Sequence, residues 1–274
     1  MDWLREERGL SLAGYDELHA WSVDDLDAFW ASIWDFFEVR SSAPYERVLG
    51  AREMPGAQWF TGARLNYAEH ILRDGRDDEP AILHSSELRA LATITRGELR
   101  REVARAAAGL RALGVGPGDR VVAYLPNIPE TVVAFLATAS LGAVWSSAAP
   151  EFGARSVIDR FAQIVPKVLL TVDGYRYGGK DHDRSELIER VQGEMPSLAH
   201  TVTLGYLDGD GGDWDEAFPE TEEELEFERV PFDHPMWVLY SSGTTGLPKA
   251  IVHSQGGILI EHLKKHNLHV DAQE

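Results

Sequence analysis

The feature that most constrains the fold is an alternation of apolar runs with helical patterns, which begins near residue 79. Four runs have the length and the β-branched content of strands: "EPAILH", "RVVAYLP", "KVLLTV" and "MWVLYSS". Residues 129–141, 154–164 and 184–195 carry helical periodicity between these runs. Because parallel strands need crossover connections, and helices supply them, the sequence predicts an α/β fold with helix-covered, mainly parallel sheets.

Two helix starts can be placed from capping residues. Ser22 followed by Asp25 predicts a helix over residues 24–39, where large apolar side chains recur at helical spacing. Thr95 and Glu98 have the spacing of a capping box at the start of an Ala- and Arg-rich helix, which we expect to end at Gly114.

Composition excludes several classes of function. The 274 residues are 44% hydrophobic and 26% charged, a globular balance, and the absence of Cys excludes disulfides, thiolate metal sites and a Cys nucleophile. The formal charge of −19 argues against nucleic acid or an anionic membrane as partner, since both require a basic surface. No apolar run approaches the length of a membrane helix, so we expect a soluble, cytoplasmic protein.

An acidic segment precedes the last predicted strand. Residues 208–228 contain eleven Asp or Glu and no Lys or Arg, with Gly and Pro interspersed. This pattern predicts a solvated loop or connector rather than a specific cation site.

The chemically richest segment is "YSSGTTGLPKA", residues 240–250. A strand that ends in such a turn presents backbone N–H groups to phosphate oxygens, hydroxyls add further donors, and Lys adds a compact positive charge. The residues predicted to bind phosphate are Ser241, Ser242, Gly243, Thr244, Thr245, Gly246 and Lys249.

A Walker A loop is the obvious competitor. Counting from Gly243 places Pro248 where its second Gly belongs and Ala250 where its Mg²⁺-binding hydroxyl belongs, which argues against a P-loop kinase or GTPase. An ordinary hairpin turn would need fewer residues of this kind.

The same segment resembles the phosphate-loop signature of the adenylate-forming superfamily, with Ser241 in place of the usual Thr and Ala250 in place of the usual Gly. The resemblance implies part of the large N-terminal domain of such an enzyme, incomplete, with the C-terminal domain absent. It implies an acyl-CoA synthetase N-terminal helical segment at residues 1–75 and the first part of an AMP-binding domain at residues 76–274. The implied cofactors are ATP, Mg²⁺ and coenzyme A. The resemblance also implies that Thr244, Thr245 and Lys249 contribute to catalysis.

Two longer stretches, "FDHPMWVLYSSGTTGLPKAIVHSQGGILIEHLKKHNLHVD" and "MPGAQWFTGARLNYAEHIL", resemble the acetoacetyl-CoA synthetases more closely than the acetyl-CoA synthetases. The resemblance implies a ligase that joins acetoacetate, or another short acyl carboxylate, to CoA through an acyl-adenylate. Because later family motifs do not occur, we expect a fragment with little activity of its own. The alternatives are a fragment of an acetyl- or other short-chain acyl-CoA synthetase and a non-catalytic nucleotide- or CoA-binding module.

A second site is implied by comparison with the acetyl-CoA synthetases, in which a Gly- and Arg-rich stretch holds CoA phosphates. The segment "GYRYGGK" follows a predicted strand at the matching place, with one additional residue, and offers Arg176 and Lys180. A solvated loop is the alternative for both cations. Open α/β sheets place ligands at the C-terminal ends of their strands, which favours binding.

The histidines provide weaker signals. His262, His266 and His269 would share one face of a helix, but the "HLKKH" spacing lacks the Glu of a zinc-protease helix, and we predict no metal site. His253 follows the phosphate-binding segment closely enough to line a substrate pocket, and His234 is expected to have a structural role.

Overall fold

The computed structural model describes residues 1–209, 212–242 and 246–272. The chain divides into two compact units, which are described separately. The first unit combines Met1–His70, Arg229–His234 and Ser254–Glu274, and the second combines Ile71–Glu228 with Pro235–His253.

The first unit holds short helices and two small antiparallel sheets. Its helices are α1 (Asp2–Arg8), α2 (Tyr15–Asp24), α3 (Leu26–Phe36), α4 (Tyr67–Ile71, which ends at the unit boundary) and α10 (Gln255–Leu263), followed by a π-helical turn (Lys264–His269). Its strands are β1 (Arg47–Ala51) paired with β2 (Gln58–Thr61), and β3 (Arg64–Leu65) paired with β12 (Val230–Pro231). The start predicted near Ser22 is wrong, because Ser22 lies inside α2 and Asp25 caps α3 by accepting from the Ala28 N–H.

Aromatic rings form the centre of this unit. Trp34 stacks on Phe60 with ring centroids 4.6 Å apart, and Phe60 lies 4.9 Å from Phe232. Gly256, in the first turn of α10, lies against the Phe232 ring, where an added Cβ would lie 2.2 Å from a ring carbon. Close packing therefore explains the glycine at this position.

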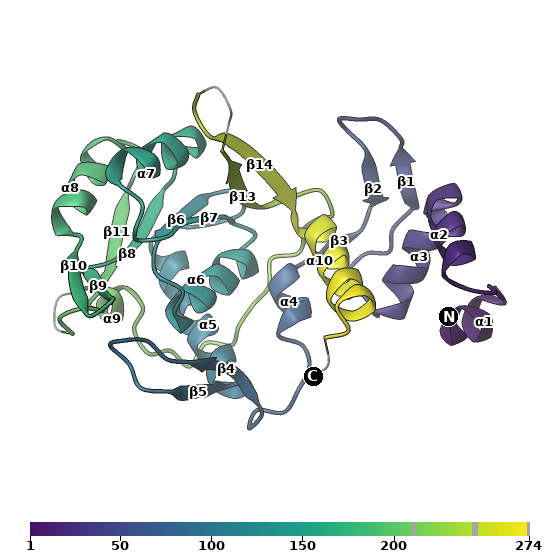
Figure 1. Ribbon diagram of the computed structural model, residues 1–274, viewed down its shortest axis with the longest axis horizontal. Helices are drawn as coiled ribbons and strands as arrows, with labels where there is room; N and C mark the ends of the chain where they lie inside the picture. The colour runs from purple at the N-terminus through teal and green to yellow at the C-terminus, as the bar shows by residue number, and fades with distance from the viewer. Residues whose placement is uncertain (210–211, 243–245, 273–274) are drawn as a thin grey trace. The chain divides into compact units, whose positions relative to one another are not determined.

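The second unit is built on a six-stranded sheet with the order β11-β8-β6-β7-β13-β14 (Figure 1). The strands are β6 (Arg120–Tyr124), β7 (Val144–Ala148), β8 (Val168–Val172), β11 (His200–Leu204), β13 (Pro235–Ser241) and β14 (Lys249–Ser254). The four pairings from β11 to β13 are parallel. The predicted helix-covered, mainly parallel sheet is confirmed.

Helices cover both faces of this sheet (Figure 1). They are α5 (Arg96–Ala112), α6 (Pro129–Ser140), α7 (Ala154–Phe161, extended by a 3₁₀ turn, Ala162–Ile164), α8 (Ser185–Gly193) and the short α9 (Trp214–Ala217). Phe161 of α7 and Val191 of α8 pack with Val122 and Leu169 of the sheet. Phe135 of α6 contacts Trp145 and Trp237. The Thr95–Glu98 capping box is confirmed, although α5 ends at Ala112.

Two antiparallel hairpins accompany the central sheet: β4 (Pro80–His84) with β5 (Ala92–Thr95), and β9 (Gly174–Tyr177) with β10 (Lys180–Asp183). The first pair of strands matches the prediction from "EPAILH" and "LATIT". The second pair was not predicted, because polar residues dominate it and no apolar alternation marks its strands.

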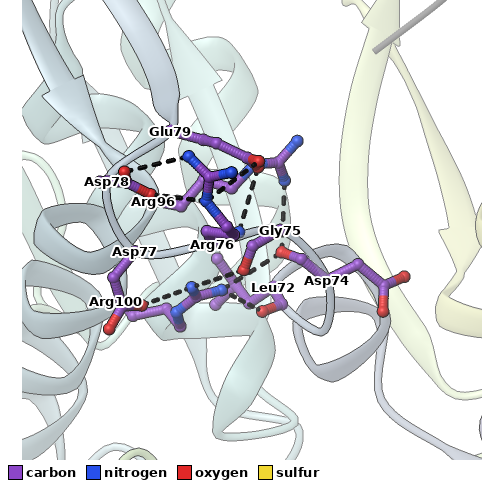
Figure 2. Close-up of polar contacts among 9 residues, drawn as sticks. All are labelled: Leu72, Asp74, Gly75, Arg76, Asp77, Asp78, Glu79, Arg96 and Arg100. Atoms are coloured by element: carbon purple, nitrogen blue, oxygen red, sulfur yellow. Dashed lines mark hydrogen bonds and ion pairs between the residues drawn. The ribbon is translucent and has the colours of Figure 1, made fainter.

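Arginines hold the loop that leads into β4, as Figure 2 shows. The Arg100 guanidinium donates to the carbonyls of Leu72 (2.9 Å), Asp74 (3.3 Å) and Gly75 (3.2 Å) and to the Asp77 carboxylate (2.7 Å). One side chain therefore satisfies three backbone acceptors of an irregular segment.

The acidic segment is a connector that is less solvated than its composition indicates. Phe218 is buried, and Arg105 of α5 binds its carbonyl and the Asp215 carboxylate. Arg111 pairs with Glu223 further along. Ion pairs and the Phe218 ring, which lies against Gly109, thus hold the segment to α5. Within the described ranges, no helix is both long and apolar enough to span a membrane.

Candidate functional site

The predicted phosphate-binding segment lies between β13 and β14, two neighbouring strands of the central sheet (Figure 1). Ser241 ends β13, Lys249 begins β14, and both are exposed, as are Ser242 and Gly246. Gly243, Thr244 and Thr245 lie outside the described residues. The structure thus brings together four of the seven predicted residues at one turn, with their side chains or backbone accessible.

Both ends of this turn are anchored to the same helical segment. On the β13 side, the Tyr240 hydroxyl donates to the Arg160 carbonyl at 2.7 Å, and burial raises the pKa of Tyr240, which keeps it a neutral donor. On the β14 side, the Gln163 amide donates to the Pro248 carbonyl at 3.0 Å. The turn is therefore held at Tyr240 and Pro248, the residues that directly precede Ser241 and Lys249.

Burial of β13 adds to this anchoring. Met236 and Val238 are buried, and the Ser146 hydroxyl of β7 donates to the Val238 carbonyl at 2.7 Å. At the far side of the turn, Gly246 has φ of +151°, a conformation that residues with a Cβ rarely adopt. Ala250 lies within β14 and is not among the residues with positive φ, so a Cβ is tolerated at this position.

His253 lies four residues after Lys249 on β14, so alternation places both side chains on the same face of the strand. The Trp237 indole N–H donates to His253 Nδ1 at 2.7 Å. An Nδ1 atom that accepts a hydrogen bond carries no proton, so the neutral ring carries its proton on Nε2. A donor in this tautomer suits an acceptor such as a carboxylate or ketone oxygen.

The predicted CoA-binding residues lie at the tip of the β9–β10 hairpin. Arg176 donates to both carboxylate oxygens of Asp181, at 2.5 and 3.1 Å, and this contact raises the pKa of Arg176 and lowers that of Asp181. Lys180 is exposed at the start of β10. Arg176 thus has a partner within its own hairpin, which sequence reasoning did not anticipate.

Sequence reasoning also missed Glu87. This residue lies in the β4–β5 loop, and its two carboxylate oxygens each accept a backbone N–H, from Gly178 and from Gly179, both at 2.7 Å. The donors and the acceptor are 91 and 92 residues apart, so no local pattern could have linked them. The tip of the β9–β10 hairpin therefore binds an anion, the Glu87 carboxylate of the same chain.

No group of three or more His, Asp or Glu within the described ranges has the arrangement of a metal site. His262 instead contacts the Tyr67 hydroxyl through Nδ1 at 3.0 Å and packs against the His266 ring. The His234 carbonyl accepts the Gln255 N–H at 2.8 Å.

Comparison with known proteins identifies the chain's relatives. Residues 73–273 match the AMP-binding enzyme family, and residues 15–71 match the acetyl-coenzyme A synthetase N-terminus. The chain is 43% identical to an acetoacetyl-CoA synthetase of Danio rerio and 42% identical to that of Rhizobium meliloti (strain 1021); the alignments cover 97% and 98% of this chain and 42% of each relative. A malonamoyl-CoA synthetase of Penicillium aethiopicum is 36% identical, with 98% of this chain and 40% of that protein covered.

A solved structure of an acetoacetyl-CoA synthetase from Streptomyces lividans superposes with a TM-score of 0.94 at 57% sequence identity, covering 98% of this chain and 43% of that one. The chain therefore spans about two fifths of the length of these relatives. The family match over residues 73–273 and the close likeness in sequence and structure show that this chain belongs to the AMP-binding enzymes, alongside the acetoacetyl-CoA synthetases.

Proposed function

We propose that this chain supplies the ATP-phosphate-binding part of an acetoacetate–CoA ligase. The observation that carries the proposal is the turn between β13 and β14, where Ser241, Ser242 and Lys249 are exposed between two anchored strands. The names of the relatives support acetoacetate as the acid. The malonamoyl-CoA synthetase shows that a related chain acts on another short acyl group, so a different short carboxylate is the main alternative.

The proposed reaction has two steps. A carboxylate oxygen of the acid bonds to the α-phosphorus of ATP while the bond to the bridging oxygen breaks, which releases pyrophosphate and leaves an acyl-adenylate. The CoA sulfur then bonds to the acyl carbon, AMP departs, and the thiol proton is lost to solvent. In the first step negative charge grows on phosphate oxygens, so hydroxyl donors and the Lys249 ammonium stabilise the transition state more than the ground state.

The residues at this turn fit a polyphosphate. Lys249 provides a compact charge with three donors, and the hydroxyls of Ser241 and Ser242 provide two more. Mg²⁺ would reach the site mainly through phosphate oxygens and water, the usual way in which proteins hold it with a nucleotide, and would neutralise phosphate charge there. In this proposal CoA phosphates contact Arg176 and Lys180. Residues 1–75 form the N-terminal helical segment of an acyl-CoA synthetase, and residues 76–274 form the first part of the AMP-binding domain.

Calorimetry of the purified chain with ATP tests the proposal directly. We expect binding by the native chain and a large loss in Lys249→Met. Failure of the native, folded chain to bind ATP would refute the proposed phosphate-binding role.

Pyrophosphate release in the product of the complete reading frame tests the chemistry. We expect release only when acetoacetate and ATP are both present, and little release from the 274-residue chain alone. ATP binding without acid-dependent pyrophosphate release by the complete product would favour a non-catalytic nucleotide-binding module.

A further inference from the structure

The tip of the β9–β10 hairpin binds the carboxylate of Glu87, a residue from another part of the second unit. Gly178 and Gly179, with φ of +60° and +71°, form the two-residue turn that joins Tyr177 to Lys180. Their N–H groups both point to the Glu87 carboxylate, at 2.7 Å each. A phosphate group presents the same pair of acceptor oxygens, so this turn can hold either group but not both at once.

The cations at the tip favour a ligand with more negative charge than one carboxylate. Lys180 is exposed directly after the turn, and Arg176 lies on the preceding strand. The Asp181 hydrogen bond chiefly raises the pKa of Arg176, and the charge of Glu87 adds a smaller effect in the same direction. A phosphate here would meet two amides and a lysine.

The loop that carries Glu87 does not depend on Glu87 for its own structure. The Ser86 hydroxyl oxygen accepts hydrogen bonds from the N–H groups of Leu88 and Arg89, at 3.2 and 3.1 Å, and from the Tyr206 hydroxyl at 2.7 Å. The Arg89 guanidinium lies over the Tyr206 ring and donates to Glu130. The exposed Glu87 side chain can therefore leave the amides by rotamer changes while the loop stays in place.

We propose that Glu87 is an internal competitor for the phosphate of an incoming CoA at the Gly178–Gly179 turn. This inference rests on the proposed contact between CoA and the hairpin that carries Arg176 and Lys180. Ligand binding then requires exchange of one anion for another at the same two amides. Removal of the carboxylate releases both donors and also removes a repulsive charge, so affinity for a phosphate ligand should rise rather than fall.

The test is a titration of the ¹⁵N-labelled chain with CoA, read at the Gly178 and Gly179 amides. In Glu87→Gln and Glu87→Ala we expect CoA to bind roughly 3- to 10-fold more tightly than in the native chain, the range of a weak competing contact. Glu189→Gln, which removes one exposed acidic charge on α8, is the control for net charge and should leave the affinity unchanged. Pantetheine, which lacks phosphate, should not shift the two amides in any variant.

The direction of the change in CoA affinity distinguishes competition from a purely structural role of Glu87. If Glu87 only holds two hairpins together, its loss leaves CoA affinity unchanged or lowers it, and either result overturns the proposal. CoA that leaves the Gly178 and Gly179 amides unshifted in both Glu87 variants overturns it as well. Intact ATP binding in the same samples would show that the proposed ATP-binding role survives such a failure.

Discussion

Two turns of the second unit combine Gly with Lys, yet they differ in what their donors contact. At the β13–β14 turn, Ser241, Ser242 and Lys249 are exposed, and the hydrogen bonds at its two ends anchor the flanking strands. At the β9–β10 turn, the Glu87 carboxylate accepts hydrogen bonds from both glycine amides, and the Asp181 carboxylate accepts from Arg176. The first turn exposes hydroxyl and ammonium donors, whereas the donors of the second turn contact acceptors of the same chain.

This difference separates binding from stability. A donor that meets an acceptor of the same chain contributes to folding, and a ligand must displace that acceptor before it can bind. A donor left to solvent contributes little to folding and is available to a ligand at once. Substitutions at the two kinds of position should therefore change different measured quantities.

The largest expected effect distinguishes the two lysines. Lys249→Met should weaken ATP binding roughly ten- to a hundredfold, since a charge-assisted contact to phosphate contributes about 1.5–3 kcal/mol. Lys180→Met is the matched control, with the same change of side chain at another exposed hairpin position, and should alter ATP affinity less than about twofold. Calorimetry on both variants gives the two affinities. Equal losses would show that general charge, rather than the β13–β14 turn, holds the nucleotide.

Substitution of Arg100 should affect the stability of the fold rather than ATP binding. Arg100→Met removes the donors to three carbonyls and to Asp77 while keeping most of the apolar stem (Figure 2). We expect a loss of about 1–2 kcal/mol in the free energy of unfolding, measured by urea denaturation, because the carbonyls lose their protein donors. ATP affinity should stay unchanged. A fall in ATP affinity without a fall in stability would contradict the separation between the two kinds of donor.

Much of the central sheet could be predicted, because its strands and helices carry local signals. The β-branched run at "KVLLTV" and the capping box at Thr95 and Glu98 are both complete within a few residues. The hairpin that contains Arg176 could not be predicted in this way. Its strands are polar, and its geometry depends on two positive-φ glycines and a glutamate 91 residues away. The start of α3 was misplaced because Ser22 and Asp25 both suit a helix cap, and only packing selects between them.

The candidate site divides in the same way. Ser241, Ser242, Gly246 and Lys249 could be proposed as phosphate ligands because they lie close together in one short segment of the sequence. The Trp237–His253 hydrogen bond joins neighbouring strands and fixes a tautomer, which the presence of His253 alone does not indicate. The Glu87 contact could not be predicted, because the sequence does not indicate that the β4–β5 loop lies next to the β9–β10 turn. Local chemistry is therefore readable from sequence, whereas the occupancy of a binding turn by the chain itself is not.

A smaller effect concerns the backbone of the β9–β10 turn. Gly179→Ala should lower stability by about 1 kcal/mol and the melting temperature by roughly 2–4 °C, because a residue with a Cβ is strained at φ of +71° although the space around it is open. Gly116→Ala is the control, since its Cβ also meets open space and its φ is not positive; it should leave stability unchanged or raise it slightly. Differential scanning calorimetry compares the two. Equal changes would mean that strain does not define this turn.

The smallest expected effect tests an internal acceptor whose titration can be followed. The Glu98 carboxylate accepts the Thr95 N–H at 2.8 Å, and this backbone hydrogen bond, the largest cause, lowers the pKa of Glu98 below 4.5. Because the pKa is lower in the folded state, the stabilisation is complete above the unfolded-state pKa and is lost as the pH falls through the folded-state value. Glu98→Gln keeps an acceptor oxygen but cannot titrate. The native protein should therefore have a slightly higher melting temperature than Glu98→Gln near pH 7, and the difference should shrink as the pH falls through the folded-state pKa of Glu98. Other carboxylates titrate in both proteins and cancel in this difference, so a constant gap across that range would show that the charge of Glu98 adds nothing to the cap.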